Sequence, residues 1–211
     1  AANPETGAAR VVLTCGETDC YADALPFNFR FVADGKKFIW TSELDGWNHI
    51  YLYDLESTSI RQLTHGAFPV AGVVAVDEKG GWVYFTGRGD RQRPYDTHLY
   101  RVSLTGGGMA RLTEATGQHE VKFAPSKGFF LDTHSTVDRP PVVELRRADG
   151  TRLQTLSRAT LDGLPAWRSH PPEEFVVKAA DRSTDLHGVL YKPHDFDPAR
   201  KYPVIEVIYG G

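Results

Sequence analysis

The sequence is poor in several features that would direct it to particular classes of protein. Its 211 residues include two cysteines and one methionine, and no apolar run reaches the length of a membrane-spanning helix. No basic segment followed by an apolar one opens the chain, so no signal peptide is recognised. The formal net charge is −3 and Lys and Arg form no dense cluster, so charge gives no case for nucleic-acid binding. With 41% hydrophobic and 24% charged residues, the composition is that of an ordinary globular protein with one large or two small domains.

The two cysteines lie close together, as Cys15 and Cys20 in the segment CGETDC. A disulfide between them would close a small loop and would indicate an oxidising compartment. Two free thiols on a loop are the alternative, and the sequence leaves both open. A zinc site is poorly supported, because no second pair of ligands follows at finger spacing.

Long stretches with helical periodicity are also missing. The sequence instead contains an internal repeat. Leu63, Leu112 and Leu156 close three similar segments at intervals of 49 and 44 residues. Each segment also contains a polar turn signal, at residues 33–36, 77–80 and 125–128. Repeats with periods in the forties indicate that a whole supersecondary unit is being repeated.

Each repeat is typical of four β-strands. Aromatic and β-branched residues alternate with polar ones in segments bounded by Gly, Asp and Pro. The expected strands are residues 27–32, 38–42, 49–54 and 60–64, then 72–76, 82–86, 98–102 and 109–113, then 121–124, 129–132, 142–147 and 151–156. Four strands at this period predict the blade of a β-propeller. A β-sandwich with evenly spaced hairpins is the alternative, and the ordered recurrence of both turn markers favours the propeller.

The pattern changes after residue 158. Residues 159–172 contain three prolines and read as a linker. Strands are expected at residues 174–178 and 186–191, and the apolar residues 204–208 predict a strand buried on both faces of an α/β sheet. We therefore divide the chain into a partial propeller (residues 1–158), a linker (159–172) and a second domain (173–211). Three blades do not close a propeller ring, so we expect the chain to be a piece of a larger protein.

Several segments carry a family resemblance. The stretches SELDGWNHIYLYDLESTSIRQLT, AVDEKGGWVYFTG and HLYRVSLTGGG resemble the propeller of dipeptidyl peptidase IV and its bacterial relatives. The tail HGVLYKPHDFDPARKYPVIEVIYGG resembles the start of the catalytic domain in the prolyl oligopeptidase superfamily. The expected fold is therefore mainly β, with a partial β-propeller of about three four-stranded blades followed by the first strands of an α/β-hydrolase domain.

The resemblance implies that the complete protein is a serine exopeptidase. Such enzymes remove dipeptides from peptide N-termini, with Pro or Ala at the second position, and use a Ser-His-Asp triad without a cofactor. The propeller restricts access and helps to bind the amino terminus of the peptide substrate. The resemblance also implies a periplasmic or secreted location. Because the family often forms homodimers, it further implies that the complete protein is a homodimer. The alternatives are a non-catalytic propeller scaffold and a related acylaminoacyl peptidase or oligopeptidase.

The resemblance assigns one catalytic role in this chain, to Tyr209. The tyrosine of the family's Tyr-Gly-Gly or Tyr-Ala-Gly motif donates its hydroxyl to the oxyanion hole, whereas an interior tyrosine at a strand end is the alternative. No serine lies in the Gly-x-Ser-x-Gly elbow that the nucleophile of this fold needs. Ser126 comes nearest but falls in a blade turn. We expect the triad to follow Gly211 and this chain by itself to be inactive.

Other polar residues favour structural roles. His49 and His98 recur at equivalent places in two repeats, which indicates blade architecture, and no histidine has the spacing of a metal site. The adjacent residues Glu173 and Glu174 read as solvated charges, although relatives bind the substrate amino group with a glutamate pair earlier in the chain. The Arg-Gly-Asp tripeptide that ends at Asp90 reads as part of an exposed blade loop, with integrin-like recognition or a small anion patch as alternatives.

Overall fold

The computed structural model describes residues 5–11, 29–164 and 170–208, and in these residues all regular secondary structure is β-strand. The chain divides into two compact units. Unit 1 comprises Ala1–Thr136 and Pro141–Arg158, and unit 2 comprises Val137–Pro140 and Ala159–Gly211. Each unit is described by itself below.

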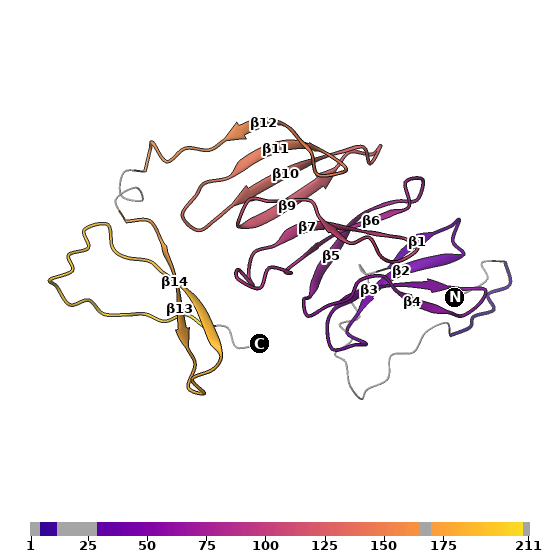
Figure 1. Cartoon of the computed structure of the whole chain (residues 1–211), viewed down its shortest axis with the longest axis horizontal. Helices are drawn as coiled ribbons and strands as arrows, with labels where there is room; N and C mark the ends of the chain where they lie inside the picture. The colour runs from indigo at the N-terminus through magenta and orange to yellow at the C-terminus, as the bar shows by residue number, and fades with distance from the viewer. Residues whose placement is uncertain (1–4, 12–28, 165–169, 209–211) are drawn as a thin grey trace. The chain divides into compact units, whose positions relative to one another are not determined.

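Unit 1 contains three four-stranded antiparallel sheets, in which strands consecutive in sequence are neighbours (Figure 1). The first sheet holds β1 (Arg30–Val32), β2 (Lys37–Ser42), β3 (His49–Asp54) and β4 (Ile60–Gln62). The second holds β5 (Val70–Asp77), β6 (Trp82–Gly87), β7 (His98–Ser103) and β8 (Ala110–Arg111). The third holds β9 (Gln118–Phe123), β10 (Phe129–Ser135), β11 (Val142–Arg147) and β12 (Arg152–Arg158). This repeated meander confirms the predicted partial propeller.

The outer strands of the first two sheets end earlier than the sequence predicts, for a common reason. Leu63 donates its backbone N–H to the Ile50 carbonyl, but the N–H of Ile50 bonds to the side-chain hydroxyl of Thr64. Leu112 and Leu99 repeat the arrangement with the hydroxyl of Thr113. A threonine side chain thus replaces the backbone acceptor where the ladder would continue, and regular pairing stops.

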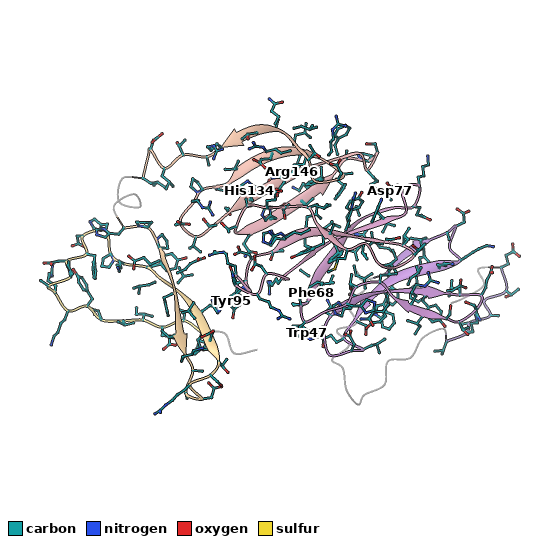
Figure 2. The ribbon with its side chains drawn as sticks, in the orientation of Figure 1. Trp47, Phe68, Asp77, Tyr95, His134 and Arg146 are labelled. Carbon is teal, nitrogen blue, oxygen red and sulfur yellow. The ribbon has the colours of Figure 1, made fainter. Side chains whose placement is uncertain are left out.

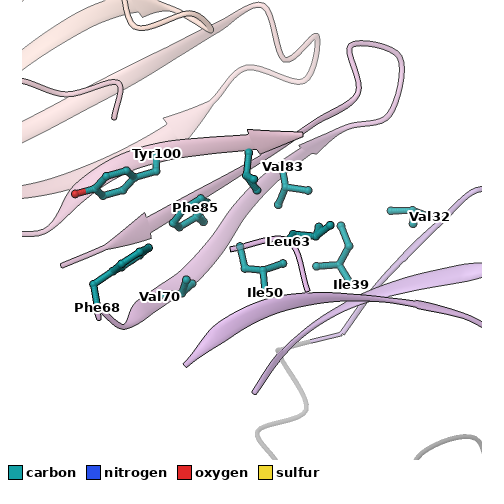
Figure 3. Close-up of a cluster of buried hydrophobic side chains, with 10 residues drawn as sticks. Val32, Ile39, Ile50, Leu63, Phe68, Val70, Val83, Phe85 and Tyr100 are labelled. Atoms are coloured by element: carbon teal, nitrogen blue, oxygen red, sulfur yellow. The ribbon is translucent and has the colours of Figure 1, made fainter. Parts of the chain in front are cut away.

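The first and second sheets pack through an apolar core (Figure 3). Ile39 and Ile50 from the first sheet meet Val83 and Phe85 from the second, and all four side chains are fully buried. Burying a side chain of this size contributes about 1.5–3 kcal/mol relative to leaving it exposed. This interface is therefore held mainly by the removal of apolar surface from water.

The second and third sheets meet through a junction of mixed character. Tyr84 of β6 stacks at a tilt on Phe123 of β9, with ring centroids 4.5 Å apart, and Phe123 contacts Phe130 in the same way at 5.1 Å. Ala75, Leu99 and Leu112 join this apolar cluster, and polar contacts lie beside it. Asp96, in the loop between β6 and β7, accepts a 2.9 Å hydrogen bond from the backbone N–H of Gly117, just before β9.

Gly117 lies where the start of β9 passes close to the end of β10 in the third sheet, and its backbone has no room for a side chain. Its φ is +119°, which L-residues rarely adopt. A Cβ atom at this position would also collide with the backbone carbonyl of Ser135. The start of β9 can lie this close to the end of β10 only with glycine at residue 117.

Unit 2 contains one antiparallel hairpin of β13 (Glu173–Lys178) and β14 (Asp185–Leu190). The strand predicted at residues 204–208 is wrong for this structure, because no strand forms there. Val204, Ile205, Val207 and Ile208 are 81% to 92% exposed. A strand apolar on both faces needs neighbouring strands and covering layers, and the only sheet among the described residues of unit 2 is β13–β14. A search of the described ranges finds no helix that could span a membrane.

Replacing Gly117 with alanine tests the close approach of β9 to β10 within the third sheet. We expect Gly117→Ala to lower the free energy of unfolding by about 2–4 kcal/mol, through the positive φ and the collision with Ser135. Urea denaturation of the chain measures the change. Gly72→Ala is the matched control, since its added methyl meets no atom within 4 Å, and it should change the value by less than about 0.5 kcal/mol. Equal effects of the two changes would contradict this account.

Candidate functional site

His49 and His98, which the sequence assigns to blade architecture, occupy equivalent buried positions. His49 Nδ1 lies 3.0 Å from Thr64 Oγ1, and His98 Nδ1 lies 3.1 Å from Thr113 Oγ1. His49 Nε2 also lies 2.9 Å from the Gly66 carbonyl, which can only accept, so Nε2 donates to it. These contacts confirm the structural interpretation.

The third sheet replaces this arrangement with a buried acid–base pair. Val142 begins β11 where the other two sheets have histidine, and the buried histidine comes instead from β9. His119 Nδ1 lies 2.7 Å from Asp132 Oδ1, and both side chains are fully buried. Its Nε2 lies 2.7 Å from the Ala115 carbonyl and donates to it. A proton must therefore lie between His119 and Asp132, whichever of the two carries it.

Three histidines from neighbouring strands stack across the junction. The ring centroid of His119 lies 5.1 Å from that of His98 and 5.2 Å from that of His134. We call His98, His119 and His134 the histidine column. The Nε2 atom of His134 is buried and makes no hydrogen bond with the described residues, although Glu144 Oε2 is 3.9 Å away.

The column ends beside a network of charged groups on β10, β11 and β12. Arg146 directs Nε and Nη2 to Glu144 Oε2, at 3.1 and 2.7 Å. Its Nε also lies 3.3 Å from Asp132 Oδ2, and its Nη1 donates to the Gly150 carbonyl. Arg152 approaches the other oxygen of Glu144 at 3.4 Å. Figure 2 labels His134 and Arg146, which lie side by side on the third sheet.

This network borders a cleft of about 580 Å³ between the second and third sheets. Its lining is mostly polar, and includes Arg111 and Glu114 from the second sheet's side. The cleft admits water to the edge of the histidine column, whereas the inner charged groups are already paired with one another. It therefore gives solvent access to a network whose buried charges, Glu144 and Arg146, already pair with each other.

The surroundings of His98, His134 and Glu144 shift the pKa values of these side chains. Burial, the charge of His119 and the charge of Arg111 lower the pKa of His98 to about 4. Burial is also the main cause that lowers the pKa of His134. Burial alone would raise the pKa of Glu144, but the hydrogen bond and charge of Arg146 outweigh it and hold this pKa below its usual value. At pH 7 His98 and His134 are neutral and Glu144 is ionised.

The arrangement does not form a catalytic centre. The His119–Asp132 pair resembles the base and orienting acid of a hydrolase, but the second ring nitrogen of His119 is occupied by a backbone carbonyl instead of facing a nucleophile. Ser126 lies in the turn between β9 and β10, where its hydroxyl accepts a hydrogen bond from Gly128. Among the residues that the structure describes, no group of three or more His, Cys, Asp or Glu is placed to hold a metal ion.

The remaining candidate residues fall in different places. Tyr209, Cys15 and Cys20 lie outside the described residues, so the oxyanion role and the disulfide stay predictions. Glu173 is on β13, where it forms a 2.6 Å ion pair with Lys192, and Glu174 follows it on the exposed hairpin.

Asp90 of the Arg-Gly-Asp tripeptide is engaged within its own loop and with a neighbouring strand. Its carboxylate accepts hydrogen bonds from the backbone N–H groups of Gln92 and Arg93 and pairs with Arg111 at 3.3 Å. An integrin-type ligand would need this carboxylate directed outward, so the contacts favour the blade-loop interpretation.

The His119–Asp132 pair escaped the sequence analysis, although a signal for it exists. Asp132 and His134 alternate on one strand and so share a face. The antiparallel register places His134 directly opposite His119. The repeat gave no help, because this pair has no counterpart in the other two sheets.

Comparisons with known proteins agree with one another. A family model described as the dipeptidyl peptidase IV (DPP IV) N-terminal region matches residues 1–141. The chain is 31% identical to a probable dipeptidyl-aminopeptidase B of Neosartorya fischeri, over 82% of this chain and 19% of that protein. It is also 31% identical to human dipeptidyl peptidase 8, over 71% of this chain and 18% of that protein.

A solved structure gives the same result. The crystal structure of Porphyromonas gingivalis dipeptidyl peptidase 4 superposes with a TM-score of 0.70 and 31% identity, over 83% of this chain and 25% of that one. The chain thus spans about a fifth to a quarter of the length of the proteins that it resembles.

Removing the charge of Asp132 tests the polar network. We expect Asp132→Asn to lower the free energy of unfolding by about 3–5 kcal/mol, because His119 and Arg146 lose a buried partner. Glu120→Gln on the neighbouring strand β9 is the control, since Glu120 forms a highly exposed pair with Lys122 and should contribute less than about 1 kcal/mol. Denaturation curves of both variants decide the point. A neutral effect of Asp132→Asn would show that the pair adds nothing to stability.

Proposed function

Because this chain belongs to the dipeptidyl peptidase IV family, we propose that it is part of a serine exopeptidase that releases N-terminal dipeptides from peptides. The proposed substrates carry Pro or Ala at the second position. The chain supplies propeller blades and the beginning of the α/β-hydrolase domain.

The observation that carries this proposal is the order of the parts along the chain. Three propeller-type sheets come first, and a separate unit follows that opens with the hairpin β13–β14. The tail after this hairpin contains the sequence KYPVIEVIYGG, which resembles the entry to a peptidase domain. A scaffold propeller has no need of such a segment after its last blade.

Tyr209 is the proposed contribution of this chain to catalysis. A phenol hydroxyl is neutral near pH 7 and can donate a hydrogen bond to the negative charge that develops on the carbonyl oxygen of the scissile peptide bond. We place the Ser-His-Asp triad in residues that follow Gly211 in the complete protein. On this proposal the 211-residue chain has no peptidase activity of its own.

The propeller's proposed role is selection. A ring of blades beside the catalytic domain limits entry to short or flexible peptides and helps to bind their amino terminus. The resemblance further supports a periplasmic or secreted location and a homodimeric assembly of the complete protein.

Hydrolysis of Gly-Pro and Ala-Pro chromogenic substrates tests the function. We expect the complete protein to turn these substrates over and the 211-residue chain to leave them intact. The variant Tyr209→Phe of the complete protein should lose about a hundredfold or more in kcat, because one oxyanion donor is removed. Tyr191→Phe is the control, since Tyr191 is 65% exposed, and its kcat should be unchanged.

Other outcomes would redirect the assignment. A complete protein inactive toward these substrates and toward longer peptides would favour a scaffold. Activity only toward blocked or longer peptides would place the protein in the acylaminoacyl peptidase or oligopeptidase branch. Turnover by the 211-residue chain itself would mean that a nucleophile lies within it.

A further inference from the structure

The two junctions between sheets in unit 1 differ in chemistry. The first and second sheets meet through Ile39, Ile50, Val83 and Phe85, and within the part of the chain that the structure describes no two histidine rings stack there. The second and third sheets meet in part through the histidine column, beside a water-accessible cleft. A fall in pH can therefore weaken the junction of the second and third sheets far more than the junction of the first and second.

The charged and titratable groups around the column come from every element packed against it. They are Asp90, Arg93 and Asp96 from the loop before β7, Tyr100 from β7, Arg111 and Glu114 from β8 and the segment after it, Asp132 from β10, Glu144 and Arg146 from β11, Asp149 from the following turn, and Arg152 from β12.

These groups leave little to stabilise added positive charge in the column. His119 already shares its Nδ1 with Asp132, and the carboxylates near His134 are paired with Arg146 and Arg152. A proton on His98 or His134 would lie one ring-stacking distance from His119, itself next to Asp132. His134 Nε2 lies 3.9 Å from Glu144 Oε2, much as His49 Nε2 lies 3.8 Å from Asp45 Oδ2 at the other junction, but Glu144 is already shared with Arg146 and Arg152.

We propose that the histidine column is an acid-sensitive latch, in which protonation of His98 and His134 releases the third sheet from the second while the first and second stay packed together. Water enters through the cleft and hydrates the rings of His98 and His134. The apolar contact between Tyr84 and Phe123 is lost at the same time. The inference rests on the geometry of unit 1 alone and is independent of the proposed peptidase function.

The direction of the effect follows from the depressed pKa values of both rings. The pKa of His98 is about 4 in the closed junction and returns to 6.5 when the ring meets water. The open form therefore binds more protons between these two values, so closure is complete above pH 6.5 and weakens as the pH falls toward 4. At pH 5 His98 alone shifts the equilibrium toward opening by about thirtyfold.

Hydrogen exchange measured by mass spectrometry on the chain at pH 7 and pH 5 tests the latch. Labelling times are scaled to the intrinsic exchange rate at each pH. We expect protection of peptides from β9, β10 and β11 to fall by about thirtyfold or more at pH 5, with β2, β3 and β6 unchanged. Unchanged protection of the third sheet, or an equal loss in all three sheets, would overturn the proposal.

Variants separate the column from general acid sensitivity. His98→Asn and His134→Gln remove the titrating groups, so the difference between pH 7 and pH 5 in the third sheet should shrink in each. His194→Gln is the control, because His194 is 74% exposed in unit 2, and it should retain the full difference. If a column variant fails to fold, the comparison of sheets in the unmodified chain still decides between the outcomes.

Discussion

A four-stranded antiparallel sheet with two largely apolar faces is stable only when each face meets another layer, and this requirement governs unit 1. The second sheet satisfies it on both sides. Val83 and Phe85 face Ile39 and Ile50 of the first sheet, while Tyr84 between them faces Phe123 of the third. The alternation of side chains along β6 thus supplies both interfaces from one strand. Without either neighbour, a face of aromatic residues would be exposed to water.

The third sheet meets the requirement differently from the first. Asp132, Glu144 and Arg146 occupy buried positions on the face directed toward the second sheet, where the first sheet presents aliphatic residues. Their charges are tolerated because Arg146 is shared between the two carboxylates and the Gly150 carbonyl. Such a network holds its members in fixed geometry, and it makes this junction sensitive to protons in a way that apolar packing is not.

Much of unit 1 follows from the sequence, because its strands are short, bounded by turns and repeated. Strands 49–54 and 142–147 were predicted with the observed bounds, and the equivalence of His49 and His98 was recognised from spacing alone. The ends of β4 at Gln62 and of β8 at Arg111 were missed, because the side-chain hydroxyls of Thr64 and Thr113 take over a backbone hydrogen bond. At residues 204–208 a strand was predicted and none forms. Hydrophobicity favours a strand there, but a strand also needs neighbouring strands as hydrogen-bonding partners.

The candidate site was harder to predict than the fold. The histidine column joins residues from three strands, and its charged surroundings add three more strands and three connecting segments. No motif of local spacing marks such a set, because the register between β9 and β10 brings His119 and His134 together. The proposed catalytic tyrosine is a different case, since Tyr209 was assigned by family resemblance and lies outside the described residues.

The unequal chemistry of the two junctions also bears on how repeated sheets find their correct neighbours during folding. Blades built from one pattern have similar shapes and could in principle stack in the wrong order. An apolar face such as that of Ile39 and Ile50 cannot accept the charged face of Asp132 and Arg146 without stripping water from ions, which costs several kcal/mol. The charged face of the third sheet thus disfavours packing against the wrong neighbour. In a protein of similar repeated sheets, this helps to determine which sheets pack together.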